Sequence, residues 1–231
     1  MKRVLLKLSG EALAGDKHTG FSEASCMEVS GQIKEIVDMG AEVAIVTGGG
    51  NFWRGRTSEN MDRSKADQIG MLATVMNCMY VSECLRSYDL DTVIYTPFAV
   101  GAFTRLYSKD EAVADLKAGK VVFFAGGTGH PYFSTDTATA LRAIEIGADC
   151  ILLAKAVDGI YDSDPATNPD AKRFDTISIS DVIDKRLLAL DLSASIMCME
   201  NKMPMRVFAL QEKDSIINAF SENNNGTIVT V

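Results

Sequence analysis

Short apolar runs alternate along the chain with longer segments in which apolar residues recur at helical spacing. Five of these runs have the length of a strand and contain few polar residues, which is typical of strands buried on both faces of a sheet. They cover residues 4–8, 42–46, 92–95, 121–125 and 150–154. The pattern therefore predicts five inner strands.

Helical spacing fills the stretches between these runs. A first helix is predicted between the first two strands, with Gly40 where a C-terminal cap belongs. Its apolar residues recur every three or four positions, at Cys26, Val29, Ile33, Ile36 and Val37. A long helix is predicted over residues 64–87.

Capping patterns mark two further helices. "SKDE" at 108–111 has the form of a capping box, in which the Ser108 hydroxyl accepts from a first-turn N–H and Glu111 reaches back. This helix is predicted to end near Gly119. Another is predicted to begin at Ser134 or Thr135 and to stop at Gly147.

The pattern changes after the fifth strand. Residues 157–174 carry two prolines and four aspartates, which predicts an exposed loop. Helices are then predicted around 180–190 and 193–202, followed by a strand, a helix and a closing strand at 205–210, 213–220 and 226–231. Because strands and helices alternate without a separating linker, the chain is predicted to form a single α/β domain, residues 1–231, with a mainly parallel sheet.

Three glycine-bearing stretches follow predicted strands: "LSGEA" the first, "TGGGN" the second and "AGGTGHP" the fourth. Ligands of parallel α/β sheets bind at the carboxyl ends of the strands. Backbone N–H groups in glycine-rich turns bind phosphate, although such glycines also occur where a turn is merely tight. Since three loops are predicted to converge and two lie beside Lys7 or Arg54, an anion site is favoured.

Composition narrows the class of protein. Hydrophobic residues make up 47% of the chain and charged residues 23%, as in ordinary globular domains. A net charge of -8 argues against non-specific binding to nucleic acid. The five dispersed cysteines lack metal-ligand spacing and predict buried, reduced thiols in a cytoplasmic protein. No apolar stretch is long enough to span a membrane, so no membrane partner is expected.

The spacing of the glycines excludes two familiar phosphate loops. A Walker loop closes with Gly-Lys-Ser/Thr, and no such triplet follows a predicted strand. A dinucleotide fingerprint requires Gly-x-Gly-x-x-Gly before the first helix, and only Gly10 follows the first strand. A Rossmann oxidoreductase is therefore disfavoured.

Five longer motifs carry a resemblance to a known family. "LLKLSGEAL", "GGGNFWRG", "IGMLATVMN", "GGTGHPYFSTDTA" and "VDGIYDSDP" occur in collinear order and span essentially the whole chain. Together they resemble the bacterial uridylate kinases of the amino-acid kinase superfamily. The resemblance implies a three-layer α/β/α sandwich with a mainly parallel central sheet. It also implies phosphorylation of UMP to UDP with magnesium-ATP.

The same resemblance implies further properties. The acceptor-binding half would cover about 1–150 and the ATP-binding half about 151–231. The chain would assemble as a homohexamer through contacts that involve the long helix. Inhibition by UTP and activation by GTP are also implied, but no motif assigns an effector site. The stretch "AGDKHTGFS" lies in a region that varies within the family, and no role is assigned to it.

Phosphoryl transfer brings two anions into line, so catalysis consists mainly of positioning and charge neutralisation. Lys7 ends a buried strand, where an ammonium group is costly without an anion, and the resemblance makes it the first catalytic candidate. Arg54 offers the planar fork of donors that suits a phosphate. Asp191 matches a family position beside the transferring phosphate, where it would orient Lys7 or hold magnesium-bound water. No protein metal cluster is expected, because phosphate oxygens and water supply most ligands of Mg²⁺.

The resemblance also assigns the two nucleotide sites. The positions matched to ATP are Lys7, Leu8, Ser9, Gly10, Gly50, Arg54, Lys155, Tyr161 and Asp164. The positions matched to UMP are Gly49, Asp67, Thr128, Gly129, His130, Pro131, Tyr132, Phe133, Ser134 and Thr135. Asp67 would hold the ribose hydroxyls, and Gly49 and Gly50 would cradle the two phosphoryl groups. His130 departs from the asparagine common in the family, and the residue at Lys155 varies there.

Structural roles compete with several of these assignments. Asp67 in a first helical turn is also a partner of the helix dipole, and Thr135 is placed to be an N-cap. Asp164 before Pro165 is a usual start of a turn, and Tyr161 is equally suited to partial burial. Asp136 is interpreted as a first-turn residue with a supporting role.

Two alternative functions stay open. The first is a superfamily kinase of a small carboxylate or of carbamate, which Asp67 disfavours because a carboxylate in the acceptor pocket would repel such substrates. The second is a non-catalytic nucleotide sensor. That reading is disfavoured by the presence of both Lys7 and Arg54, which a sensor would not need.

Overall fold

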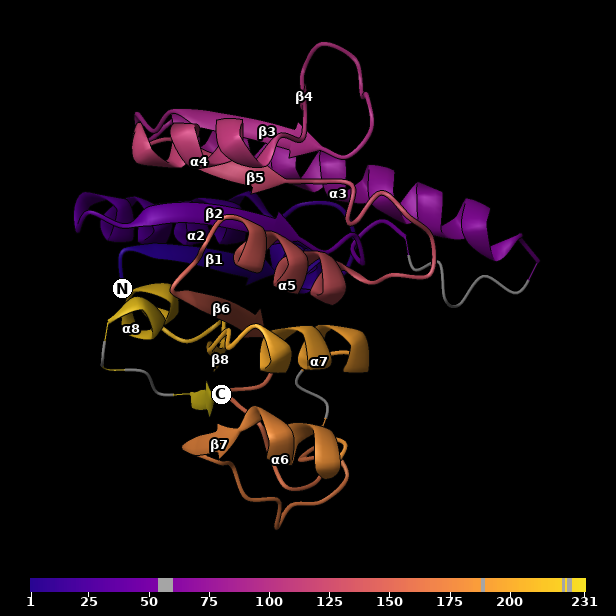
Figure 1. The fold of residues 1–231 in the computed structure, drawn as a ribbon, viewed down its shortest axis with the longest axis vertical. Helices are drawn as coiled ribbons and strands as arrows, with labels where there is room; N and C mark the ends of the chain where they lie inside the picture. The colour runs from indigo at the N-terminus through magenta and orange to yellow at the C-terminus, as the bar shows by residue number, and fades with distance from the viewer. Residues whose placement is uncertain (54–59, 188–189, 222, 224–225) are drawn as a thin grey trace.

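The protein was analysed as a computed structural model that describes residues 1–53, 60–187, 190–221, 223 and 226–231. Within these residues, nine strands form one sheet in the order β4-β3-β5-β2-β1-β6-β8-β9-β7 (Figure 1). Their bounds are β1 Arg3–Leu8, β2 Glu42–Thr47, β3 Thr92–Thr96, β4 Arg105–Leu106, β5 Val121–Phe124, β6 Cys150–Lys155, β7 Thr176–Ser178, β8 Met205–Ala209 and β9 Thr227–Thr230. All pairings are parallel except that of β8 with β9. The mainly parallel α/β sheet predicted from the sequence is confirmed.

Helices cover both faces of the sheet and make it the middle of three layers. The described helices are α1 Gly10–Ala14, α2 Glu23–Asp38, α3 Arg63–Arg86, α4 Lys109–Lys117, α5 Thr135–Glu145, α6 Ile179–Asp184, α7 Leu192–Glu200 and α8 Ser215–Phe220, with a 3₁₀ turn at Gly15–Lys17. Residues of α2, α3 and α8 belong to one apolar core, and residues of α4 to α7 belong to the other. The α/β/α sandwich is therefore confirmed.

Strand β1 shows how the sequence divides between the two cores. Val4, Leu6 and Leu8 lie in the core beneath α2 and α3, whereas Leu5 lies in the core beneath α5. Successive residues of a strand point to opposite faces, so a central strand with helices on both sides must be apolar throughout. Lys7 is the charged residue among the buried positions of β1, with 8% of its surface exposed, whereas Arg3 at the start of the strand is only half-buried.

The two halves of the chain lie on opposite sides of β1 within the sheet. Strands β2 to β5 stand on one side, and β6 to β9 stand on the other, with β7 and α6 at the lower end of the view in Figure 1. Both halves thus contribute to one continuous sheet. The assignment of an acceptor half to 1–150 and an ATP half to 151–231 stays a prediction.

Several elements differ from those that the sequence predicts. Strands β4 and β7 and helix α1 were not predicted, because each is short and two of them lie largely at the surface. The helix predicted over 180–190 ends at Asp184, and Arg186 beyond it has a φ of 53°. The last helix begins at Ser215, two residues after the predicted start.

The predicted helix ends at glycine are confirmed. Gly40, Gly119 and Gly147 all have φ between 64° and 92°, in the left-handed region that favours glycine after a helix. The prediction of buried thiols is also confirmed, since all five cysteines are buried and free. Burial raises the pKa of the Cys78 thiol to about 12, which keeps it protonated at neutral pH.

Candidate active site

The three glycine-bearing loops meet at one edge of the sheet. They follow β1, β2 and β5, which are parallel neighbours in the order β5-β2-β1. The first two loops are in direct contact, since the Gly48 N–H donates to the Leu8 carbonyl at 2.8 Å. A Cβ on Gly10 would lie 2.4 Å from Asn51 Oδ1 and 2.9 Å from the Gly50 nitrogen. Only glycine lets the two loops approach this closely.

A buried lysine stands at the base of these loops. The Lys7 Nζ lies 2.8 Å from Asp136 Oδ1, in the first turn of α5. The Lys155 Nζ, at the end of β6, lies 4.0 Å from the other oxygen of the same carboxylate. Because β1 and β6 are parallel neighbours, both strands deliver an ammonium group to one place. The Lys7–Asp136 pair was not predicted, since the two residues are far apart in the sequence.

Burial sets the electrostatics of this cluster. It lowers the pKa of Lys155 below the usual lysine value, and the charge of Lys7 lowers it further, while Asp136 and Asp191 oppose the shift. Two ammonium groups at a partly dry sheet edge attract an anion strongly, because water screens them less than it would at the surface. The cluster is therefore suited to a phosphate group.

Asp191 joins the same region from another element. It is the N-cap of α7, and its carboxylate accepts from the Ala194 N–H at 2.8 Å. It also accepts from the hydroxyl groups of Thr137, at 3.1 Å, and Ser134. The structure thus brings Asp191 to the start of α5, next to the residue that pairs with Lys7. Its predicted catalytic role stays a prediction.

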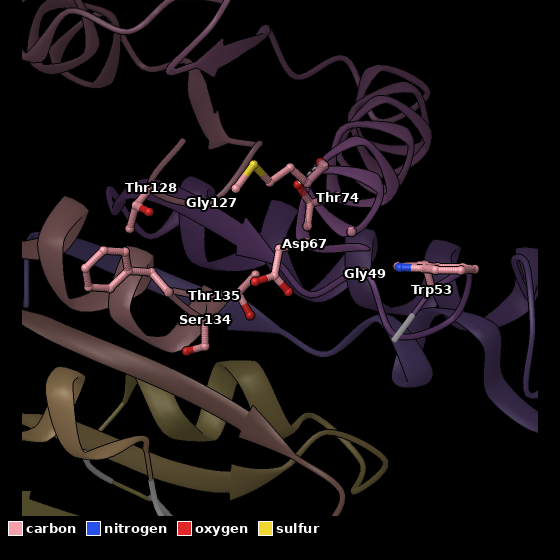
Figure 2. Close-up of a pocket in the computed structure, with 11 residues that line it drawn as sticks. Gly49, Trp53, Asp67, Thr74, Gly127, Thr128, Ser134 and Thr135 are labelled. Atoms are coloured by element: carbon pink, nitrogen blue, oxygen red, sulfur yellow. Dashed lines mark hydrogen bonds between the residues drawn. The ribbon is translucent and has the colours of Figure 1, made fainter. Parts of the chain in front are cut away.

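A pocket opens beside the lysines between α3 and the loop after β5, residues 126–134, here called the acceptor loop. Figure 2 shows the side chains of α3 and of the acceptor loop grouped around the Asp67 carboxylate. The lining consists of Gly49, Trp53, Asp67, Gly70, Met71, Thr74, Gly127, Thr128, Phe133, Ser134 and Thr135. Five residues predicted for the acceptor site, besides Gly49, therefore line one pocket. Gly129, His130, Pro131 and Tyr132 lie in the same loop without lining the pocket.

The Asp67 carboxylate links helix and loop. It accepts from Arg63 Nε at 2.9 and 3.0 Å and from the Tyr132 N–H at 2.8 Å. Tyr132 has a φ of 72°, and the Arg63 guanidinium lies 5.4 Å from the centre of its ring. A carboxylate has about four lone-pair positions, so these contacts leave acceptor capacity for a further donor. Asp67 stands beyond the first turn of α3, which begins at Arg63, so the first-turn position suggested by the sequence, with its role as a partner of the helix dipole, is wrong.

Two hydroxyl groups, one of a threonine and one of a serine, fix the ends of the acceptor loop. The Thr74 hydroxyl of α3 accepts from the Gly126 N–H at 2.8 Å, which ties the loop to the helix. Ser134, and not Thr135, is the N-cap of α5, because its hydroxyl accepts from the Asp136 and Thr137 N–H groups. Thr135 therefore stands in the first helical turn and lines the pocket.

Trp53 closes the pocket on the side of the second glycine loop. Its Nε1 donates to the Ala66 carbonyl of α3 at 2.8 Å. The neighbouring Phe52 contacts the Phe21 ring at a centroid distance of 5.2 Å and is 41% exposed. Arg54, predicted to bind phosphate, lies outside the described residues. Its role stays a prediction.

A second hollow lies over the loop after β6. Tyr161 and Asp164 line it together with Val157, Ile160 and Arg186, among others. The Tyr161 hydroxyl donates to Asp158 at 2.6 Å, and Asp164 begins a turn by accepting from the Ala166 N–H at 2.9 Å. The structure thus brings together the two residues predicted for the adenosine of ATP. Lys155 stands apart from them, with Asp136.

The long helix α3 also has an exposed apolar side. Leu72 and Met76 expose 50% and 44% of their surface, and Ile69 and Met79 are exposed as well. In Figure 1 this helix extends past the edge of the sheet. The homohexamer implied for this helix stays a prediction.

No described helix is long and apolar enough to cross a membrane. Among the same residues, no group of three His, Cys, Asp or Glu side chains could hold a metal ion.

The sheet, the converging loops and the paired lysines define an enzyme of the amino-acid kinase class. The model of the amino acid kinase family matches residues 2–209. The UMP kinase of Bacillus anthracis has a similar structure, with 35% identity, a TM-score of 0.95 and coverage of 99% of this chain and 96% of that one. The UMP kinase of Ureaplasma parvum is similar at 31% identity and a TM-score of 0.94, covering 100% and 99% of the two chains. The chain belongs to the amino acid kinase family, in which it groups with the bacterial UMP kinases, and it is a phosphotransferase.

Proposed function

We propose that the protein transfers the γ-phosphoryl group of magnesium-ATP to the phosphate of UMP, giving UDP and ADP. An oxygen of the UMP phosphate attacks the γ-phosphorus, and the bond from that phosphorus to the bridging oxygen of ADP breaks. The observation that carries the proposal is the position of Lys7, which lies at the edge of the sheet that carries the glycine loops and pairs with Asp136 in the first turn of α5. The similarity to two UMP kinases supports the choice of acceptor.

Each part of the site has a role in this reaction. Lys7 and Arg54 offset the charge that spreads over the transferring group, and Lys155 contacts the ATP phosphates. The distance of 4.0 Å from the Lys155 Nζ to the carboxylate that pairs with Lys7 supports this role. Leu8, Ser9, Gly10 and Gly50 supply backbone groups to the ATP phosphates, and Gly49 supplies one to UMP. The magnesium ion arrives with ATP. The carboxylates of Asp136 and Asp191 beside the lysines fit the oxygen ligands that Mg²⁺ takes.

The acceptor pocket fits a nucleotide better than a small carboxylate. Asp67 faces the pocket, and its remaining acceptor capacity suits a hydroxyl group of a ribose. The same negative charge would repel a carboxylate or carbamate acceptor. A non-catalytic sensor would have no use for two lysines that share a carboxylate at this edge of the sheet.

Release of ADP from magnesium-ATP, measured by a coupled assay with UMP, CMP and carbamate, tests the proposal. We expect turnover with UMP and far slower release with the other two acceptors. Absence of turnover with UMP would contradict the proposed reaction. Equal rates with CMP would contradict selection of uracil by the acceptor loop, and turnover with carbamate alone would favour the alternative kinase.

Replacing Asp67 by asparagine is expected to raise the KM for UMP about 10-fold and to leave the KM for ATP within about twofold. The change keeps the shape of the side chain but removes the charge that strengthens a hydrogen bond to the ribose, worth about 1.4 kcal/mol for a tenfold effect. Steady-state kinetics with each substrate varied gives both constants. Glu83→Gln, an exposed carboxylate of the same helix, is the matched control. Equal changes in both constants would refute a specific contact with UMP.

A further inference from the structure

A pair of buried asparagine amides lies beneath the glycine loops. Asn51 follows the triple glycine after β2, and Asn77 stands in the middle of α3. They expose 2% and 0% of their surface. The Asn77 Nδ2 donates to Asn51 Oδ1 at 2.8 Å, and the Asn51 Nδ2 donates to Asn77 Oδ1 at 3.0 Å. The two amides thus bond to each other in both directions.

Each amide uses its second hydrogen on the backbone of a loop. The Asn77 Nδ2 donates to the Gly48 carbonyl at 2.6 Å, and the Asn51 Nδ2 donates to the Gly20 carbonyl at 2.8 Å. All four amide hydrogens and both side-chain oxygens therefore have partners. A buried polar network in which every member is satisfied stabilises one arrangement over others.

The network joins segments that carry the proposed phosphate contacts. Gly48 and Asn51 are the two ends of the glycine loop, so Asn77 holds both ends from α3. The Gly20 N–H also donates to the Asn51 carbonyl at 3.2 Å. On the other side, Asn51 Oδ1 lies against Gly10, where there is no room for a Cβ. The path of the loop between Gly48 and Asn51 is thereby set from three directions.

We propose that Asn77 is a positioning residue for phosphoryl transfer, because it holds both ends of the glycine loop through Gly48 and Asn51. The inference rests on the proposed function, in which Gly49 and Gly50 receive the two phosphoryl groups. In-line transfer tolerates little displacement, since a shift of about 1 Å costs up to about 100-fold in rate. Asn77 itself touches neither nucleotide in this proposal and acts through the loop.

An apolar residue of the same size would not replace the amide. Leucine at position 77 would fill the space but would leave the Gly48 carbonyl and the Asn51 amide without their buried partners. Those groups would then move toward water or toward other donors, and the loop would move with them.

The first test compares Asn77→Leu and Asn77→Asp with the wild type by steady-state kinetics. We expect kcat to fall by about 10- to 100-fold, with a smaller rise in the KM for UMP, because Gly49 of the loop contacts UMP in this proposal while the ribose contact at Asp67 is elsewhere on α3. Ser82→Ala is the matched control, because Ser82 is a buried residue of the same helix whose hydroxyl contacts the Thr92 hydroxyl at 2.7 Å, away from the loops. This control is expected to keep the wild-type kcat.

A double-mutant cycle tests whether the two asparagines act as one unit. Asn51→Ala and Asn77→Ala are each expected to lower kcat, and the double variant is expected to be little slower than the slower single variant. If the two changes lowered kcat independently, so that their effects multiplied, the two asparagines would not act as one unit.

Circular dichroism and thermal unfolding identify variants that have lost their fold. Asn77→Asp, which keeps the volume and an acceptor oxygen, serves where Asn77→Leu fails to fold.

The single tryptophan of the chain gives a readout that does not depend on activity. Trp53 lies two residues after the glycine loop, and its Nε1 donates to the Ala66 carbonyl. We expect Asn77→Asp and Asn77→Leu to shift the Trp53 emission to longer wavelength and to increase its quenching by acrylamide, whereas Ser82→Ala leaves both unchanged. Wild-type emission together with wild-type kcat in both variants would overturn the proposal. A wild-type protein that does not turn over UMP would refute the proposed function. In that case the Trp53 emission would still test whether Asn77 holds the glycine loop in place.

Discussion

Replacing Lys7 by alanine is expected to lower kcat by about 1,000-fold, while the protein keeps its fold. Preorganised charge directed at a transition state is worth about 3–4 kcal/mol per group, because little reorganisation occurs during the reaction. Lys7 is such a group, since the ion pair with Asp136 and the neighbouring strands hold it in place. Loss of this ammonium group leaves the charge on the transferring phosphoryl group less compensated.

The fold is expected to survive because Asp136 does not lose all of its partners. Removing one member of a buried ion pair is usually strongly destabilising, since the other charge is left unpaired. Here the Lys155 Nζ lies 4.0 Å from the same carboxylate and stays available to it. Thermal unfolding should therefore show a modest loss of stability, small beside the loss of kcat.

Measurement of kcat at saturating UMP and ATP, with thermal unfolding in parallel, checks this prediction. Lys2→Ala is the control. The Lys2 side chain precedes β1, is 79% exposed, and its Nζ lies 3.5 Å from Glu42 Oε1. It is expected to leave kcat unchanged. A folded Lys7→Ala protein with a kcat near that of the wild type would refute the catalytic role of Lys7.

Replacing Gly10 by alanine is expected to reduce both activity and stability. The added Cβ would meet Asn51 Oδ1 at 2.4 Å and the Gly48 carbonyl at 2.9 Å, and both are parts of the second glycine loop. The loops must then separate, which costs about 1–3 kcal/mol of unfolding free energy by analogy with overpacked cores. Because the two loops are proposed to hold the phosphates of ATP and UMP, we expect kcat to fall at least about 100-fold.

Gly31→Ala provides the contrasting result. Gly31 lies within α2, and a Cβ there would have its first neighbour, the Tyr88 hydroxyl, at 3.4 Å. Alanine is a better helix former than glycine, so the variant is expected to gain about 0.5–1 kcal/mol with unchanged kcat. Chemical denaturation gives both free energies. A Gly10→Ala protein as stable and active as Gly31→Ala would contradict the close contact of the loops.

The long elements of the fold could be predicted from the chain alone. Strands β1, β2, β3, β5 and β6 are continuous apolar runs, and α2 and α3 show helical spacing over several turns. Such patterns are reliable because burial on one or two faces requires them. Strand β4 has two exposed residues, so it has no apolar pattern and was missed. Its pairing with β3 depends on the position of the neighbouring strand.

The candidate site was predicted in part. Lys7, Asp67 and the acceptor loop were identified from motifs, and the structure places five acceptor residues around one pocket with Gly49. The partner of Lys7 was not identified, because Asp136 follows it by more than half the chain. The Asn51–Asn77 pair was also not identified, although only 26 residues separate its members. Amide residues in loops and helices carry no periodic signal that marks them as paired.

The sequence by itself determined the long strands and helices and which edge of the sheet carries the glycine loops. These features depend on local spacing and on the parallel order of alternating elements. Only the tertiary structure decided that Lys7 and Lys155 share Asp136, that Gly10 has no room for a Cβ, and that Asn77 holds the loop from α3. Contacts between residues distant in the chain follow from how the layers pack, and local patterns do not encode that packing.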